Sequence, residues 1–90
     1  VVDDSSNDGS KEVIEEYCKK YPQITFISNM ENMGMCRSFN QAFALSKGDF
    51  IINLAADDYF HPLKIENDIQ AFLKLGKDWG VIFSDAWHID

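Results

Sequence analysis

The sequence is poor in cysteine, in basic residues and in long apolar runs. Its two cysteines, Cys18 and Cys36, lack the spacing of metal ligands, so we interpret both as small hydrophobic residues in a reducing cytoplasm. Eight basic residues are scattered among fifteen acidic ones, and the formal net charge is −7. Nucleic acid is not an expected partner, because a polyanion binds through clustered lysines and arginines. No run is long and apolar enough to cross a bilayer, and no segment resembles a signal peptide.

The length of the chain favours part of a domain. Ninety residues can form one small domain, but an α/β unit with both faces of its sheet covered usually needs more chain. The sequence opens on the strand-like pair Val1-Val2 without an initiator methionine, and it closes just after another apolar run. It contains no internal repeat, low-complexity tract or linker. We therefore expect residues 1–90 to be a single partial domain.

The apolar pattern predicts strands that alternate with helices. Short apolar or β-branched runs predict strands at residues 1–2, 24–28, 50–55 and 81–84. Helical spacing predicts helices at residues 10–20, capped by Ser10, at 35–47, and at 62–75, with Pro62 at the start and Gly76 at the end. The run at 50–55 is almost continuously apolar, which is typical of a central strand. The order β-α-β-α-β-α-β implies an α/β fold, a mostly parallel Rossmann-like sheet with helices on both faces.

Acidic residues follow three of the predicted strands. Asp3 and Asp4 follow the first, Asp57 and Asp58 the third, and Asp85 the fourth, so all of them can face one cleft beyond the carboxyl ends of the strands. The first pair can accept hydrogen bonds from a base or a sugar, or can form an Asx-type turn that starts a helix. The second pair offers oxygen ligands for Mg²⁺ or Mn²⁺, or it is a solvated loop before a helix. Asp85 can touch an acceptor or simply end its strand.

A basic residue lies at the start of the second predicted helix. Gly34 permits a tight turn, and Arg37 falls in the first helical turn, where a guanidinium and the helix N-terminus together suit a diphosphate. Asn40 lies on the same polar side as Arg37. The predicted buried face holds Met35, Phe39, Ala42 and Phe43. The alternative for Arg37 is a solvated surface arginine.

In this order, the segments resemble the nucleotide-binding half of a family 2 glycosyltransferase with the GT-A fold. VVDDSSNDGS resembles the family's VDDGSxDGT turn, and NMGMCRSFNQAF resembles its NxGxxxARN helix. KGDFIINLAADD resembles its kGeyIxfLDxDD strand and metal motif, and the following P-x-K helix and final vvysD strand also match. The resemblance covers essentially all ninety residues, and the order and spacing of its motifs make it more specific than any single match.

The resemblance implies a metal-assisted, inverting glycosyltransferase. Its donor is a nucleotide-diphospho-sugar, UDP-linked, its acceptor is a sugar or lipid-linked hydroxyl, and its cofactor is Mn²⁺ or Mg²⁺. By resemblance, the nucleotide-sugar contacts Asp3, Asp4, Arg37, Asn40, Asp57 and Asp58, the last two hold the metal, and Asp85 faces the acceptor. The implied role is the synthesis of a polysaccharide, glycolipid or cell-surface glycan, in the cytoplasm at the inner face of the membrane, with membrane association of the parent protein.

The chain departs from the family pattern in two respects. Ala55 stands where the family commonly has the first aspartate of its DxD motif, which leaves fewer acidic metal ligands. The family's opening strand would precede Val1, and its general base is expected beyond Asp90. We therefore assign no catalytic residue within the chain, and expect this segment alone to be catalytically incomplete.

Two other functions agree with parts of the sequence. VVDDS also resembles the acid pocket of a receiver-type phosphoacceptor signalling domain. Against that hypothesis, the next acidic strand end comes later than in receivers, it carries two aspartates, and no lysine follows a later strand. A non-catalytic nucleotide-sugar binding module is the other alternative, and Ala55 is the one feature that favours it.

Overall fold

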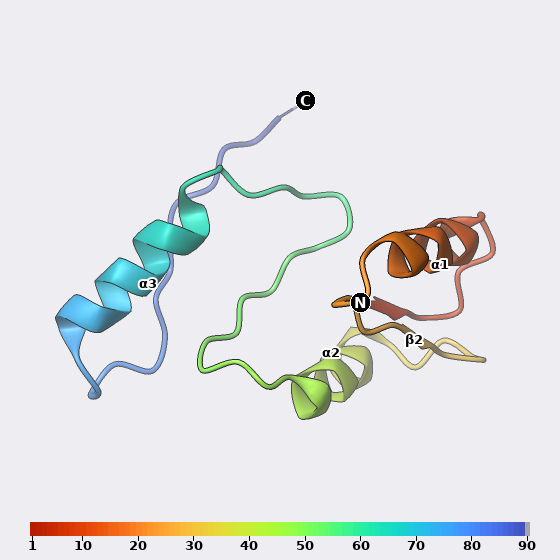
Figure 1. The fold of residues 1–90 in the computed structure, drawn as a ribbon, viewed down its shortest axis with the longest axis horizontal. Coiled ribbons are helices and arrows are strands. Elements are labelled where there is room, and N and C mark those ends of the chain that lie inside the picture. The colour runs from red at the N-terminus through yellow and green to blue at the C-terminus, as the bar shows by residue number, and fades with distance from the viewer. Residues whose placement is uncertain (90) are drawn as a thin grey trace. The chain divides into compact units, whose positions relative to one another are not determined.

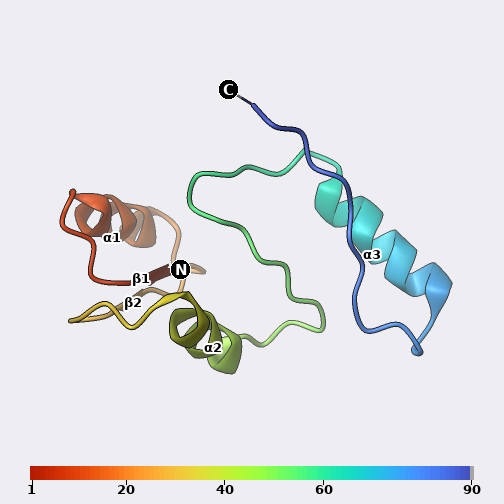
Figure 2. The same ribbon diagram turned by 180° about the vertical axis from the view of Figure 1, so that it is seen from behind.

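The computed structural model describes residues 1–89. The chain forms two compact units, one of Val1–Ile51 and one that begins at Ile52. The first unit contains strand β1 (Val2–Asp3), helix α1 (Ser10–Lys20), strand β2 (Ile27–Ser28) and helix α2 (Met35–Leu45), and the second contains helix α3 (Lys64–Leu75). In both views of the first unit, β1 and β2 lie between α1 and α2 (Figures 1 and 2).

The two strands form a small parallel sheet. Asp3 of β1 lies opposite Ser28 of β2, and the pairing continues one step further, where the backbone N–H of Asn29 donates to the carbonyl oxygen of Asp3 at 2.9 Å. The parallel direction agrees with the predicted fold. Because parallel strands end at the same edge, Asp4 and Asn29 leave the sheet next to each other.

Helix α1 begins after a left-handed glycine. Gly9 has φ 87° and is the N-cap, so Ser10 is the first helical residue and the prediction that Ser10 caps the helix is wrong. The capping interaction comes instead from Asp8, whose Oδ1 accepts hydrogen bonds from the N–H of Ser10 at 3.1 Å and from its Oγ at 2.6 Å. The helix ends at Lys20, and Tyr21, directly before Pro22, is its C-cap, as predicted.

Helix α2 begins at the predicted residue but turns a different side toward the sheet. Ser38 and Gln41 are half-buried, whereas all four residues of the predicted buried face are exposed, namely Met35, Phe39, Ala42 and Phe43. The prediction of that face is therefore wrong for the described residues. The reason is that hydrogen bonds from Asn29 hold the polar side of the helix against the strand ends. The helix ends at Leu45, where Ser46 Oγ donates to the carbonyl oxygen of Phe43 at 2.7 Å.

Helix α3 is shorter at its start than the sequence predicts. It begins at Lys64 and ends before Gly76, whose φ of 82° suits the predicted glycine terminus. The N–H of Lys64 donates to the carbonyl oxygen of His61 at 2.8 Å, so a separate turn precedes the helix. Lys64 also forms an i,i+4 ion pair with Asp68. Within residues 1–89, none of the helices combines the length and the apolar character needed to cross a membrane.

The two later predicted strands are not formed in the described residues. Residues 50–55 and 81–84 are not in strands, and the sheet of the described residues has the order β1-β2. The full strand and helix order predicted from the sequence is therefore not confirmed. The physical reason is that a strand has no hydrogen bonds of its own and becomes regular only beside another strand.

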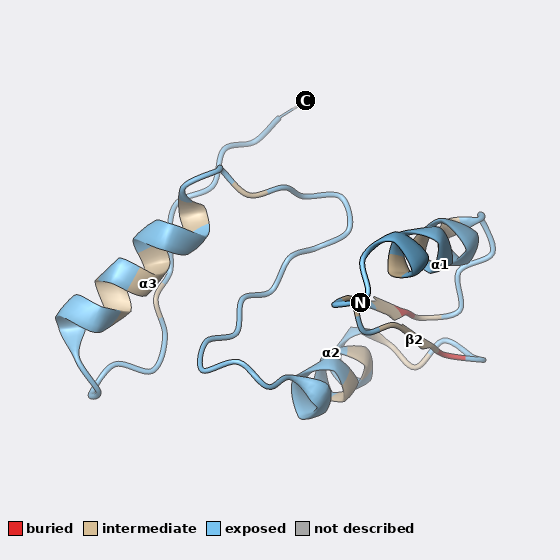
Figure 3. Cartoon of the chain, in the orientation of Figure 1, coloured by how far each residue is buried: buried red, intermediate tan, exposed pale blue. Residues whose placement is uncertain are grey.

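Burial in the described residues is confined to two polar side chains. Asp3 is 5% exposed and Asn29 is 9% exposed, and no apolar side chain of the described part is buried (Figure 3). On α3, the half-buried apolar residues include Ile69 and Phe72. Both cysteines are free, with Cys18 half-buried and Cys36 exposed. The most buried side chains of the first unit are therefore polar, and they lie where the strands end.

Candidate functional site

The carboxyl edge of the sheet carries a set of hydrogen bonds to Asp4. Its Oδ1 accepts from Asn29 Nδ2 at 2.8 Å and from the N–H of Met33 at 2.9 Å. Its Oδ2 accepts from the N–H of Gly34 at 2.7 Å. Asp4 follows β1, Asn29 follows β2, and Met33 and Gly34 form the turn before α2. One carboxylate thus joins the ends of three elements.

Asn29 extends these bonds along α2. Its Nδ2 lies 3.1 Å from Gln41 Oε1 and 3.4 Å from Ser38 Oγ, in addition to its bond with Asp4. An amide nitrogen has two hydrogens for these three acceptors, so the shorter contacts to Asp4 and Gln41 are the stronger ones. We call this set the Asp4 cluster, with the members Asp4, Asn29, Met33, Gly34, Ser38 and Gln41.

The cluster lowers the pKa of Asp4 below its ordinary value of 3.8. The backbone N–H of Met33 has the largest effect, followed by the side-chain amide of Asn29, while partial burial acts in the opposite direction. Hydrogen bonds from Gly34 and Ser38 lower the pKa further. Asp4 is therefore a carboxylate at neutral pH, and its negative charge lies beside the N-terminus of α2, where the helix dipole favours an anion.

Asp3 is held in a turn at the end of β1. Its carboxylate Oδ2 accepts a hydrogen bond from the N–H of Ser6 at 3.3 Å, and Ser5 between them has a left-handed φ of 70°. This bond spans three residues and no helix begins here, since α1 begins later at Ser10, so it is not the helix-starting Asx-type turn that the sequence offered as an alternative. It leaves the predicted contact with a nucleoside untested. The side chain is 5% exposed, so little of its surface meets solvent.

Arg37 and Asn40 are both exposed on α2. Arg37 is the third residue of the helix, and Gly34, the N-cap, is the residue whose N–H bonds to Asp4. The first helical turn therefore starts from the Asp4 cluster, and Arg37 is exposed two residues after the helix begins at Met35. A guanidinium at a helix start can bind a phosphate group, and for Arg37 this contact stays a prediction.

The other predicted residues belong to the second unit and are exposed. Asp57 and Asp58 lie in a turn in which the N–H of Asp58 donates to the carbonyl oxygen of Ala55 at 3.2 Å. Asp85 lies in a segment without regular secondary structure. The convergence of these acids with Asp3 and Asp4 on one cleft stays a prediction. The general base expected beyond Asp90 lies outside the described residues.

The donor set of the second unit fits a cation that shares its ligands with a substrate. No group of three or more histidine, cysteine, aspartate or glutamate residues in the described part of the chain could hold a metal alone. Magnesium is commonly bound by one or two carboxylates together with substrate phosphates, and it keeps several waters. Two adjacent exposed carboxylates are compatible with that mode of binding.

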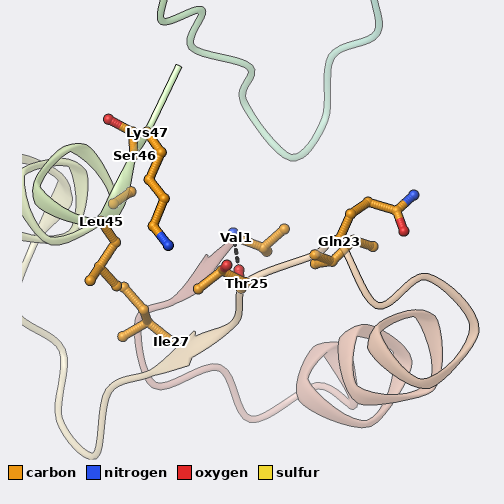
Figure 4. Close-up of a pocket in the computed structure, with 9 residues that line it drawn as sticks. Val1, Gln23, Thr25, Ile27, Leu45, Ser46 and Lys47 are labelled. Carbon is orange, nitrogen blue, oxygen red and sulfur yellow. Dashed lines mark hydrogen bonds between the residues drawn. The ribbon is translucent and has the colours of Figure 1, made fainter.

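A pocket of the first unit lies at the other edge of the sheet. It is lined by the start of β1, by the segment before β2 and by the end of α2, with the residues Val1, Gln23, Ile24, Thr25, Ile27, Ala42, Leu45, Ser46 and Lys47 (Figure 4). The amino group of Val1 donates to the carbonyl oxygen of Thr25 at 2.7 Å across it. None of the residues predicted to bind substrate lines this pocket. We therefore place the candidate site at the carboxyl edge.

Besides the backbone donors, sequence reasoning missed the three other members that take part in the Asp4 cluster through their side chains. Asn29, Ser38 and Gln41 were not predicted as site residues, although each has a recognisable signal. Asn29 follows the second strand as Asp4 follows the first, so both must reach the same edge of a parallel pair. Ser38 and Gln41 are three residues apart, which places two polar side chains on one side of the helix.

Comparison with known proteins identifies the family. The sequence matches the family described as Glycosyl transferase family 2 over residues 1–87. An uncharacterized glycosyltransferase of Methanocaldococcus jannaschii is 33% identical over 90 residues, which cover 100% of this chain and 31% of that protein. A dolichyl-phosphate beta-glucosyltransferase of Trichomonas vaginalis is 31% identical over 95 residues, covering 100% and 27%. A chondroitin synthase of Escherichia coli is 31% identical over 74 residues, covering 82% and 11%.

The similarities cover only part of each relative. The chain spans less than a third of the length of each of the three relatives. No solved structure is significantly similar to it. The family match includes both aspartate pairs, Arg37 and Asp85, and it agrees with the resemblance that the sequence motifs indicated. The chain belongs to glycosyl transferase family 2.

Proposed function

We propose that the protein transfers a sugar from a nucleotide-diphospho-sugar, UDP-linked, to the hydroxyl group of a sugar or lipid-linked acceptor, with inversion at the anomeric carbon. The observation that carries the proposal is the family match over residues 1–87. The structure adds a physical basis for donor binding, because the start of α2 is fixed by Asp4 and presents an exposed guanidinium. The relatives named for chondroitin and for dolichyl-phosphate support a glycan or a lipid-linked acceptor.

The first unit supplies the groups for the nucleotide. Arg37 would pair with the diphosphate, since a guanidinium offers a planar set of donors that matches phosphate oxygens. Asn40 lies one turn further along α2 and would donate to the same donor molecule. Asp3 and Asp4 would mark the nucleoside end of the site, at the carboxyl edge of the sheet.

The second unit supplies acids for a cation and for the acceptor. Asp57 and Asp58 would hold Mn²⁺ or Mg²⁺ together with the diphosphate of the donor. A divalent cation bound there supplies positive charge that stabilises the leaving diphosphate. Asp85 would orient the acceptor hydroxyl. A lipid-linked acceptor would place the reaction at the inner face of a membrane and its product in a glycolipid, polysaccharide or other cell-surface glycan.

The two alternatives from the sequence are not favoured. A receiver-type signalling domain belongs to a different family from the one that matches residues 1–87. A non-catalytic binding module is less consistent with relatives that are named as transferases and synthases. The departure at Ala55 remains the feature that a transfer assay must address, because a binding module would retain the donor without consuming it.

A titration tests the roles of the second acid pair. UDP is titrated into the full-length protein with and without Mn²⁺, for the wild type and for the Asp57→Asn/Asp58→Asn variant. We expect the variant to lose the gain in affinity that Mn²⁺ gives, a decrease of about tenfold or more, since two anionic metal ligands become neutral.

The Glu15→Gln/Glu16→Gln variant is the matched control. It neutralises an adjacent pair of exposed acids on α1, a helix that carries none of the proposed site residues, so it makes the same change in net charge. It should bind UDP and Mn²⁺ as the wild type does. Equal Mn²⁺-dependent affinities for the wild type and the Asp57/Asp58 variant would contradict the metal assignment, and absence of sugar transfer by the wild type would contradict the enzyme.

A further inference from the structure

The carboxylate of Asp4 is already engaged within the fold. Its two oxygens accept three hydrogen bonds of 2.7 to 2.9 Å, two from backbone N–H groups and one from Asn29. A backbone N–H cannot rotate to another acceptor, so a ligand that took over Asp4 would leave the N–H of Met33 without its acceptor, whereas the N–H of Gly34 would keep a bond to Asn32 Oδ1 at 3.1 Å. Leaving such a donor unpaired has a free-energy cost comparable to that of a lost hydrogen bond.

The bonds to Asp4 determine where α2 begins. Gly34 is the N-cap of α2, its N–H bonds to Asp4, and its carbonyl oxygen accepts from the N–H of Ser38 at 3.1 Å, so it joins the strand end to the first helical turn. Arg37 lies within that turn. From the second strand, Asn29 reaches Ser38 and Gln41 on the same helix. The first turn of α2 is therefore held to both strand ends.

We propose that Asp4 is a positioning residue, which together with Asn29 fixes the first turn of α2 so that Arg37 is presented to the donor diphosphate. The inference rests on the proposed function and deepens it, because it replaces a direct contact between Asp4 and the nucleoside with an indirect action on the phosphate-binding side chain. Asn29 acts with Asp4 as the second positioning residue. The charge of Asp4 is compatible with this role, because both of its oxygens are paired with N–H donors.

The proposal predicts that Asp4 affects binding of the diphosphate and not binding of the nucleoside. Comparing the affinities for UDP and for uridine tests this difference. The Asp4→Asn variant keeps the size of the side chain but replaces one acceptor oxygen with an NH₂ group, so one of the bonds to Met33 or Gly34 must be lost. In the full-length protein, we expect this variant to bind UDP about fivefold to tenfold more weakly while its affinity for uridine stays within about twofold. In an Arg37→Ala background, Asp4→Asn should have no further effect on UDP affinity.

Amide hydrogen exchange gives a second readout that does not depend on any ligand. The amide that loses its bond, the N–H of Met33 or that of Gly34, should exchange about tenfold faster in Asp4→Asn than in the wild type. Asp8→Asn is the matched control, because Asp8 is also an aspartate that accepts a backbone N–H, at Ser10 of α1. It should leave both amides and UDP affinity unchanged. Asn29→Ala, which keeps the carboxylate of Asp4, should weaken UDP binding in the same direction.

Each outcome decides between the roles. Equal losses of uridine and UDP affinity would assign Asp4 to direct nucleoside contact and overturn the proposal. So would additive losses in the Arg37→Ala background, or unchanged exchange at Met33 and Gly34. A wild-type protein that does not bind UDP would instead contradict the proposed donor, and the exchange comparison alone would then decide whether Asp4 fixes the turn. If Asp4→Asn does not fold, Asn29→Ala provides the same comparison of UDP with uridine.

Discussion

Asp4 carries a negative charge at the point where two strands and a helix meet. The backbone N–H of Met33, then the amide of Asn29, lower the pKa of its carboxyl below 3.8, so the folded state binds a proton less readily than the unfolded chain does. A group with a lowered folded-state pKa stabilises the fold fully above its unfolded pKa of about 3.9, and this stabilisation is lost as the pH falls through the folded value. The ionisation of Asp4 therefore makes the free energy of unfolding of the first unit depend on pH.

This linkage gives a prediction for acid solutions. We expect the difference in free energy of unfolding between the wild type and Asp4→Asn to be largest at pH 7 and to shrink as the pH falls below about 4. Urea denaturation of both proteins between pH 7 and pH 3 measures it. Asp8, whose pKa is lowered first by the side chain of Ser10, contributes its own acid dependence, and Asp8→Asn removes that part. A difference between wild type and Asp4→Asn that is constant across this range would show that Asp4 is not bonded as a carboxylate.

At the scale of single residues, the sequence indicated candidate residues but could not indicate their contacts. It singled out Asp3, Asp4 and Arg37 because charged residues after a strand or at a helix start are recognisable from spacing alone. It could not predict that Asp4 bonds to Met33 and Gly34, because those donors are backbone groups that every residue except proline carries. Their orientation depends on the turn, which three-dimensional structure alone reveals.

Helix α2 owes its position to a turn that requires glycine. Gly34 has φ 83° and ψ 159°, a combination that residues with a side chain rarely adopt. No atom lies within 4 Å of the position that a β-carbon would occupy there, so a substitution would meet backbone strain rather than a steric clash. The turn bonds to Asp4 on one side and to Ser38 on the other. The turn that positions Arg37 therefore requires glycine at residue 34.

The corresponding prediction concerns Gly34→Ala. We expect a loss of about 1–3 kcal/mol in the free energy of unfolding, because alanine is strained at this φ and ψ, and weaker UDP binding as the first turn of α2 shifts. Gly80→Ala is the control, since Gly80 also has open space around it but lacks a left-handed φ. The control should change stability by no more than about 0.5 kcal/mol. Equal effects of both substitutions in urea denaturation would contradict the role of the turn.

At the scale of elements, all three predicted helices are formed and their ends differ by a few residues. Helices satisfy their hydrogen bonds within a short segment, so apolar spacing and a terminal glycine such as Gly76 are sufficient signals. The predicted face of α2 was wrong because apolar residues alone were assigned to the inside. Gln41 and Ser38 occupy that side instead, since a buried amide at Asn29 needs polar partners.

At the scale of the whole molecule, the sheet was the least predictable part. The sequence predicted four strands, and the described residues pair two of them, β1 and β2. Residues 50–55 have the apolar composition of a central strand, but their regular form depends on neighbours that are distant in sequence. The apolar pattern indicates which residues tend to be buried. Whether a segment forms a strand depends on the neighbouring strands with which it pairs. Family membership, which depends on the order of motifs, was predictable without it.

The proposed metal site raises the question of whether two aspartates suffice where the family commonly has three. The turn at Asp57 and Asp58 closes through the bond from the N–H of Asp58 to the carbonyl oxygen of Ala55, so residue 55 belongs to the same turn. A carboxylate at that position would add an anionic oxygen ligand, and cation affinity rises with the charge count of a site. The departure at Ala55 should therefore lower the affinity for Mn²⁺ without abolishing binding.

Ala55→Asp should consequently lower the Mn²⁺ concentration that gives half-maximal UDP binding by about tenfold in the full-length protein. Ala56→Asp is the matched control, because it adds the same charge at the neighbouring residue, where the family has no aspartate. If the gain comes from ligation, it should appear in Ala55→Asp alone and should vanish when Asp57 and Asp58 are changed to asparagine. If both variants gain equally, the added charge attracts Mn²⁺ in general, and the acids at this turn do not form a defined metal site.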